Sequence, residues 1–181
     1  LTRLLLANKS KTVNDTTVSK HGGQVGGWTP LHLACMNGHA EVAAALLECG
    51  ANIEARDGVQ RTPLFLASQS DSLQVASLLI GRGANINAVA ARGYTPLLWG
   101  ARTKREAYVN LLIANRAAIE SDDRLAALQF AVVGGLDNLY AYVLELGYNL
   151  ADAKERDPGL VFPAAAGGSV EIVRSLLSNG F

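Results

Sequence analysis

Apolar residues recur along this chain in short blocks that are separated by polar and glycine-rich segments. Residues 29–34 read TPLHLA, and the block returns at 62–67 (TPLFLA) and at 95–100 (TPLLWG), each copy 33 residues after the one before. Worn copies follow at 126–131 (AALQFA), after 31 residues, and at 159–164 (GLVFPA), after 33 more. A fixed period of about 20–50 residues is the signature of stacked repeat proteins.

A second apolar block keeps the same register in every copy. It ends in a pair of aliphatic residues, namely Leu46-Leu47, Leu79-Ile80, Leu112-Ile113, Val143-Leu144 and Leu176-Leu177. Three residues beyond each pair stand Gly50, Gly83, Arg116, Gly147 and Gly180. Five copies in one register are not a product of chance.

One copy predicts two short helices and an extended arm. Thr29 is suited to cap the first helix, and Pro30 stands where its missing N–H is not needed. Apolar residues at helical spacing predict a second helix over 41–48, and Gly50 can adopt the left-handed conformation that ends it. Residues 51–61 are typical of an extended arm and a turn. Such helices bury their apolar faces only by stacking copy on copy.

These motifs resemble those of the ankyrin-repeat family. The resemblance rests on Thr-Pro-Leu-His at 29–32, the pair Gly38-His39, the helix from Glu41-Val42 to Leu46-Leu47 and the exit Gly-Ala-Asn-Ile at 50–53, and it covers about residues 27–181. It implies an all-α solenoid of stacked helix-turn-helix units with β-hairpin arms. In that family the arm tips and first helices form a concave face.

The register also sets the expected domain boundaries. Residues 1–8 resemble the end of a preceding repeat, and 9–26 form a polar insertion loop. The expected repeats are 27–59, 60–92, 93–123, 124–156 (degenerate) and 157–181 (degenerate and truncated). The pattern at both ends indicates a piece of a longer array or multidomain protein.

Two departures from the pattern predict local changes. Arg116 replaces the closing glycine, and Ala126-Ala127 replaces Thr-Pro, so we expect a weak joint in which Asp122 or Asp123 caps a helix that begins early. In the last copy Pro163 falls inside the expected first helix, which should therefore be kinked or begin late.

Composition and charge narrow the function classes. With 49% apolar residues in 181, the chain should fold; its 16 basic and 16 acidic residues cancel, which argues against nucleic acid as a partner. The apolar runs are too short for membrane insertion, and no signal peptide is evident. Two cysteines, Cys35 and Cys49, fit a reducing compartment. We expect an intracellular protein, cytoplasmic or nuclear, that is monomeric as an isolated array.

Each motif that could bind a ligand or react also has a purely structural explanation. His32, Cys35 and His39 have the spacing of zinc ligands, but the family motif expects both histidines. The glycine-rich 22–29 segment places Trp28 where a phosphate-binding loop needs lysine. The Asp122-Asp123 pair indicates a solvated turn or a helix cap. We therefore expect no enzyme activity, no cofactor and no metal.

The family resemblance implies a protein-protein interaction scaffold that binds a protein on its concave face. The alternative is an intramolecular regulatory array within a larger enzyme, receptor or channel. The expected contact positions lie just before each Thr-Pro and at the end of each first helix: Trp28, Met36, Asn37, Arg61, Gln69, Ser70, Arg92, Tyr94, Arg102 and Thr103. Trp28, Arg61 and Tyr94 are one period apart and should form one stripe. Aromatic and arginine side chains favour an acidic, partly apolar partner segment.

Overall fold

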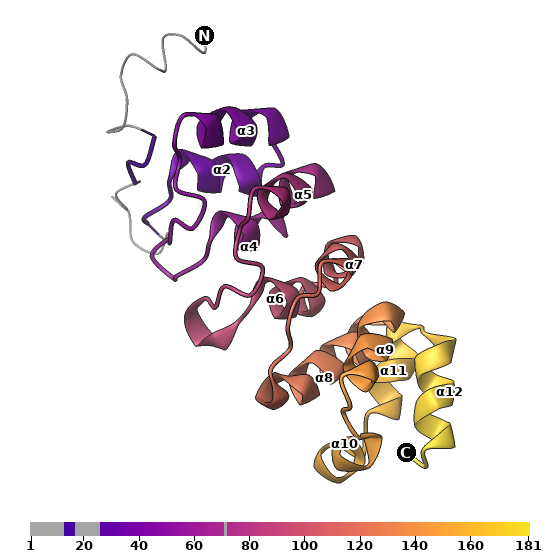
Figure 1. The fold of residues 1–181 in the computed structure, drawn as a ribbon. Coiled ribbons are helices and arrows are strands. Elements are labelled where there is room, and N and C mark those ends of the chain that lie inside the picture. Colours follow the sequence, from indigo (N-terminus) through magenta and orange to yellow (C-terminus); the bar gives the residue numbers. More distant parts are fainter. Residues whose placement is uncertain (1–12, 17–25, 71) are drawn as a thin grey trace. The chain divides into compact units, whose positions relative to one another are not determined.

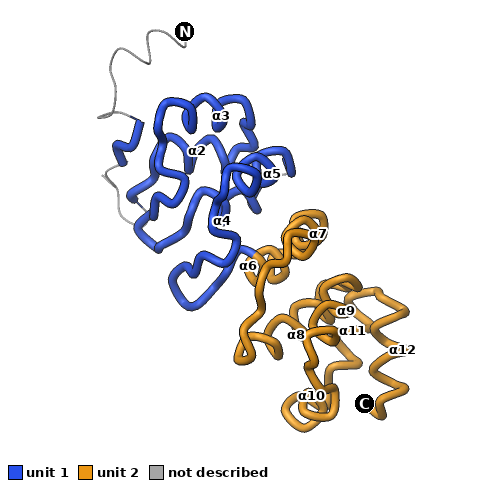
Figure 2. The backbone as a smooth tube through the Cα atoms, viewed as in Figure 1, with its two compact units in different colours: residues 1–96 blue, residues 97–181 orange. Residues whose placement is uncertain are grey.

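The computed structural model describes residues 13–16, 26–70 and 72–181, and these residues form helices and turns without a strand. The chain divides into two compact units, residues 1–96 and 97–181 (Figure 2). The helices of the first unit are α2 (Pro30–Met36), α3 (Ala40–Glu48), α4 (Pro63–Ala67), α5 (Leu73–Gly81) and the 3-10 turn η1 (Ala91–Gly93). Those that continue into or lie in the second are α6 (Pro96–Arg102), α7 (Glu106–Ala114), the 3-10 turn η2 (Ser121–Asp123), α8 (Arg124–Gly134), α9 (Asp137–Glu145), α10 (Leu150–Arg156), α11 (Val161–Gly167) and α12 (Val170–Ser178).

The first helices of the first unit begin where the Thr-Pro motif predicts. Thr29 and Thr62 are extended residues whose hydroxyls accept from backbone amides of the first turn, at 3.4 Å and 3.3 Å. The following prolines occupy the first helical position, where no N–H donor is required. The helix starts predicted from sequence are therefore confirmed at both positions.

Helix pairs stack on one another within each unit. In the first unit α2 lies against both α3 and α4, and α4 lies against α5 (Figure 1). Within this stack the aliphatic residues of the repeated block are buried. Leu31, Leu64 and Leu66 are each at most 1% exposed. In the second unit α8 and α9 stack on α11 and α12 in the same way. The all-α fold of stacked helix pairs is confirmed.

The arms are tight turns joined by isolated backbone hydrogen bonds. The Ala90 N–H donates to the Tyr94 carbonyl at 2.8 Å, and the Asp57 N–H donates to the Arg61 carbonyl at 3.1 Å. A bond from the Ala91 N–H to the Val59 carbonyl, 2.9 Å long, links neighbouring arms. The hairpin arms are thus present as turns, too short to form strands in the part of the chain described.

One arm prediction is wrong, because a helix follows α9. Asn149 caps α10 by accepting from the Ala151 N–H at 2.9 Å, and Leu150 and Ala153 bury one face. Asp152 lies in the first turn, while Lys154 and Arg156 lie in the last, which suits the helix dipole. These local preferences outweigh the extended arm of the other copies.

At the joint after α7 the backbone conformation agrees with the prediction, but the predicted helix cap is absent. Arg116 is left-handed, with φ of 57°, as its place in the pattern requires. The next helix begins at Arg124, three residues before Ala127, the counterpart of Pro30. Asp123 precedes that helix, but its side chain makes no capping bond, so the expected cap is wrong. The 3-10 turn η2 starts the helix instead, with the Asp123 N–H bonded to the Glu120 carbonyl at 3.0 Å.

Pro163 shifts the start of the last first helix. Helix α11 begins at Val161, so Pro163 lies in the first turn, where its ring breaks no intrahelical hydrogen bond. The preceding segment 158–160 is a turn. The prediction of a late start is confirmed.

The expected preceding repeat at 1–8 lies outside the described residues. So does the 9–26 insertion, apart from 13–16 and 26. Within that part, Asn14 accepts from the Asn52 N–H at 2.7 Å and donates to the Gly50 carbonyl at 3.2 Å. These two bonds satisfy backbone groups at the exit of α3.

Candidate protein-binding surface

A buried carboxylate organises the arm edge of the first unit. Asp57 is 2% exposed and lies in the turn between α3 and α4. Its Oδ2 accepts from Trp28 Nε1 at 3.1 Å and from Arg61 Nε at 2.7 Å, and Arg61 Nη2 lies 2.7 Å away. The Arg61 guanidinium also lies over the Trp28 ring, 6.0 Å from its centroid. Trp28 and Arg61, two of the three expected stripe residues, are therefore held together by Asp57.

Backbone N–H groups of the turn donate to the other oxygen of this carboxylate. Asp57 Oδ1 accepts from the Val59 N–H at 3.0 Å and from the Arg61 N–H at 2.8 Å. A buried carboxylate is tolerated only when it is paired with a cation and hydrogen-bonded. Here Oδ2 is paired with Arg61, and both oxygens accept hydrogen bonds. The result is a rigid turn in which Arg61 uses its guanidinium within the chain. The expected bidentate bond from Arg61 to a partner would have to break this pair.

His32 lies directly behind the same edge and has a structural role. Its Nδ1 accepts from the Thr29 N–H at 3.1 Å, so Nε2 carries the proton and donates to the Arg61 carbonyl at 3.1 Å. Burial lowers the pKa of His32 below its ordinary value, against the opposing effect of the bond to Arg61. The structural interpretation of His32 is confirmed, since both ring nitrogens are used within the chain.

Arg92 and Tyr94 extend the edge at the next arm. Arg92 is left-handed, with φ of 64°, and Gly93 follows with φ of 78°, which makes a tight turn that leaves the Arg92 side chain exposed. Tyr94 is half-buried. The structure thus places Trp28, Arg61, Arg92 and Tyr94 on successive arms of one unit.

The expected contact positions at the ends of the first helices have a second, structural use. Asn37 Nδ2 donates to the Leu33 carbonyl at 2.8 Å, Ser70 Oγ to the Ala67 carbonyl at 3.0 Å, and Thr103 Oγ1 to the Trp99 carbonyl at 2.8 Å. Each polar side chain adds a second hydrogen bond to a carbonyl at the helix end that already accepts a backbone N–H. These bonds account for the polar residue at this position in the first three copies.

The residue directly before each of these polar residues differs in type from copy to copy. Met36 is half-buried, whereas Gln69 and Arg102 are exposed. The Arg102 guanidinium lies over the Trp99 ring, 5.3 Å from its centroid. These side chains are presented on the surface at the end of each first helix.

Basic residues in and beside the third copy occupy left-handed backbone positions. Four non-glycine residues in the described ranges have positive φ, and three of them are basic: Arg92, Lys104 and Arg116. Lys104 has φ of 58° where the first, fourth and fifth copies have Gly38, Gly135 and Gly168. The basic side chains here are retained at positions whose conformation favours glycine.

Other candidate groups carry no reactive geometry. Burial raises the pKa of the Cys35 thiol to about 12, so it remains protonated and packs as an apolar side chain. Asp122 and Asp123 lie in η2 at the surface. No group of three His, Cys, Asp or Glu side chains suited to a metal ion occurs in the ranges that the structure describes.

The sequence pattern does not reveal the organising role of Asp57, which lies in the 51–61 segment typical of an arm and a turn. The spacing of Asp57 and Arg61, four residues apart, is a weak signal for the ion pair. The partner Trp28 lies 29 residues away, and only the period brings it near.

Successive helix pairs joined by turn-like arms define a helical repeat protein. A family model for ankyrin repeats, in three copies, matches residues 1–90 and 57–123. The chain therefore belongs to the ankyrin-repeat family, whose members generally mediate protein-protein interactions and are typically non-catalytic. No curated protein matches the chain. None of the helices described is long and apolar enough to cross a bilayer.

Proposed function

We propose that this chain is a non-catalytic scaffold that binds a protein partner along its arm edge and first-helix ends. The residues involved are the ten expected from sequence: Trp28, Met36, Asn37, Arg61, Gln69, Ser70, Arg92, Tyr94, Arg102 and Thr103. We further propose that each helix pair with its arm is one repeat, within the boundaries given above.

The observation that carries this proposal is the fixed geometry of Trp28. Its only polar side-chain atom is bonded to Asp57, and Arg61 covers its ring from one side. The indole is half-buried, so part of its apolar surface faces solvent. A partner that contacts this surface meets a side chain already ordered, which lowers the entropic cost of binding. Tryptophan is among the residues that most often dominate interface energies.

The charge pattern supports an acidic, partly apolar partner segment. Residues 92–116 contain five basic side chains and one acidic one. Because Asp57 neutralises Arg61, the attraction is assigned to Arg92, Arg102 and their basic neighbours rather than to Arg61. Steering by such charges raises association rates and is screened by salt.

Site-specific photo-crosslinking tests the proposal directly in cell extract. A photoreactive phenylalanine derivative at position 94 should link the chain to one or a few acidic proteins. The same group at position 74, an exposed site on α5, is the control and should not. Equal crosslinking from both positions, or none from position 94, would contradict the proposed edge.

A further inference from the structure

A groove lies between α7 and α9, the second helices of the third and fourth copies, and it shares no residue with the arm edge. It lies wholly within the second unit and has a volume of about 280 Å³. Its lining residues are Asn110, Ile113, Ala114, Asn138, Ala141, Tyr142 and Glu145. We propose that it docks a second protein partner, through a segment that carries one large apolar side chain followed by a basic residue.

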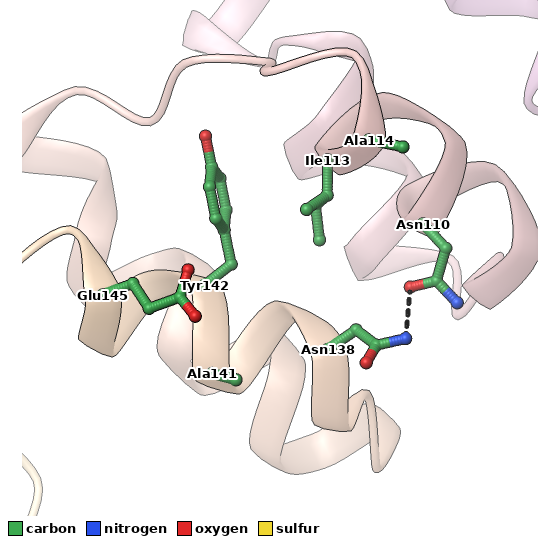
Figure 3. Close-up of a pocket in the computed structure, with 7 residues that line it drawn as sticks. All are labelled: Asn110, Ile113, Ala114, Asn138, Ala141, Tyr142 and Glu145. Carbon is green, nitrogen blue, oxygen red and sulfur yellow. Dashed lines mark hydrogen bonds between the residues drawn. The ribbon is translucent and has the colours of Figure 1, made fainter.

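The centre of the groove is apolar because two small residues leave space beside two larger ones. Figure 3 shows Ile113 of α7 pointing into the space above α9, with Tyr142 standing at its side. Ile113 and Tyr142 are half-buried, and the alanines at 114 and 141 are exposed. The volume is below the roughly 300–1,000 Å³ typical of small-molecule pockets. It is suited to a single large side chain from a partner.

One end of the groove presents unused amide groups. Asn138 Nδ2 donates to Asn110 Oδ1 at 3.2 Å, as the dashed line in Figure 3 marks. Asn110 Nδ2 and Asn138 Oδ1 thus remain as a donor and an acceptor that no other residue of the described ranges occupies. If both amides were flipped, one donor and one acceptor would again remain. A glutamine side chain on a partner helix supplies the complementary acceptor and donor.

The other end of the groove carries the carboxylate of Glu145, while Arg116, which follows α7, lies outside the lining. Glu145 is exposed and forms no ion pair with another residue of the described part. Every charged side chain within α7 and α9 is acidic, namely Glu106, Asp137 and Glu145. Asp137 accepts from the Ser169 hydroxyl, so Glu145 is the charge that the groove offers. This charge selects a basic residue in the partner.

The spacing of these features sets the spacing in the partner. Ala141 and Glu145 are four residues apart on α9, which is about 6 Å along a helix axis. An apolar residue and a basic residue at i and i+4 of a partner helix have the same separation. The preferred occupant is therefore a helical segment with Leu and Arg at that spacing.

The test uses the full chain labelled with 15N and a capped peptide of about 15 residues, which is long enough to form a helix. The peptide is rich in alanine and glutamine and carries one Leu and, four residues later, one Arg. At peptide concentrations up to about 1 mM, amide shifts should change at the groove residues and not at the arm edge. Absence of shifts, or shifts outside the groove, would overturn the proposal.

Paired variants of peptide and protein separate docking from non-specific contact. Replacing the peptide Leu by Ala should weaken binding about ten-fold, and replacing Arg by Glu about five-fold. Ala141→Leu should abolish the shifts by filling the groove, whereas Ala107→Leu, at an exposed site on α7 outside it, should not. Glu145→Gln should weaken the Arg peptide about three-fold and leave an Arg→Gln peptide unchanged, as a double-mutant cycle requires.

Two further outcomes would also overturn the proposal. Equal affinity of the Arg and Glu peptides would show that the groove does not select a basic segment. Concentration-dependent shifts at the groove residues without peptide would show that a second copy of the chain fills the groove.

Discussion

At the scale of single residues, Asp57 determines how the arm edge is built. One buried carboxylate accepts from two backbone amides, from an indole and from a guanidinium. Loss of the carboxylate would leave four donors without their acceptor in and beside a turn. The orientation of Trp28 and the fold of the turn therefore depend on the same side chain.

Replacing Asp57 tests this dependence. Asp57→Ala should lower the free energy of unfolding by about 3 kcal/mol, because a buried charged acceptor is removed from several donors. Glu48→Ala, at an exposed site at the end of α3, should change it by less than about 0.5 kcal/mol. Urea unfolding of both variants measures the difference. Similar values for the two would show that Asp57 does not hold the edge.

His32 predicts a pH dependence of stability. Because burial lowers the folded pKa of His32 below its ordinary value of about 6.5, the folded state binds fewer protons than the unfolded state below that pH. Stability from this residue is complete above about pH 6.5 and is lost as the pH falls, by up to about 1.4 kcal/mol per pH unit. In His32→Gln, which keeps a donor and an acceptor, the loss between pH 7 and pH 5.5 should be smaller. Equal slopes in urea titrations would contradict the prediction.

At the scale of elements, the joint between α7 and α8 combines strain with an uncapped start. Arg116 is left-handed, with φ of 57°, and the Asp123 side chain does not cap α8. In the other copies a glycine ends the second helix without this cost.

Relieving the strain should stabilise this joint. Arg116→Gly should raise the free energy of unfolding by about 1 kcal/mol and slow amide exchange in residues 117–126. The reverse exchange, Gly83→Arg, should cost a similar amount, since Gly83 has φ of 83° and open space around its Cβ position. Hydrogen-exchange mass spectrometry checks both. Faster exchange in Arg116→Gly would show that the arginine contributes contacts that outweigh its strain.

The sequence predicted the elements well where the signal was local. Thr29 and Thr62 cap their helices, Arg116 is left-handed and Pro163 delays α11, because each effect depends on a few neighbouring residues. Helix α10 also has local signals in Asn149 and the charge order that follows it, but the repeat pattern masked them.

Contacts between distant residues could not be predicted in the same way. The bond between Trp28 and Asp57 joins residues 29 positions apart, and its geometry depends on the turn that Arg61 completes. The groove between α7 and α9 depends on which side chains of the two helices line the space between them. Sequence period gave the neighbourhood of these residues, whereas side-chain direction required the three-dimensional structure.

At the scale of the whole molecule, the two proposed binding surfaces differ in character. The arm edge is aromatic and basic, while the groove in the second unit is apolar and acidic. A scaffold with these two surfaces selects an acidic partner at the arm edge and a basic partner in the groove.

Salt dependence distinguishes the charged arm edge from an apolar one. The association rate of the arm-edge partner should fall as ionic strength rises from about 0.05 M to 0.5 M, because basic residues steer an acidic segment. Stopped-flow fluorescence of Trp28 and Trp99 measures the rate. A rate independent of salt would assign the binding to apolar contacts alone.

The most direct test of the central proposal is the affinity of a crosslinked and purified partner for matched variants of the chain. Trp28→Ala and Tyr94→Ala should each weaken binding about ten-fold or more, equivalent to roughly 1.4 kcal/mol. Gln74→Ala, at an exposed site on α5, should change the dissociation constant by less than about two-fold. Calorimetry on folded variants gives all three values. If Trp28→Ala and Tyr94→Ala bind the partner as tightly as Gln74→Ala does, the arm edge is not the binding surface.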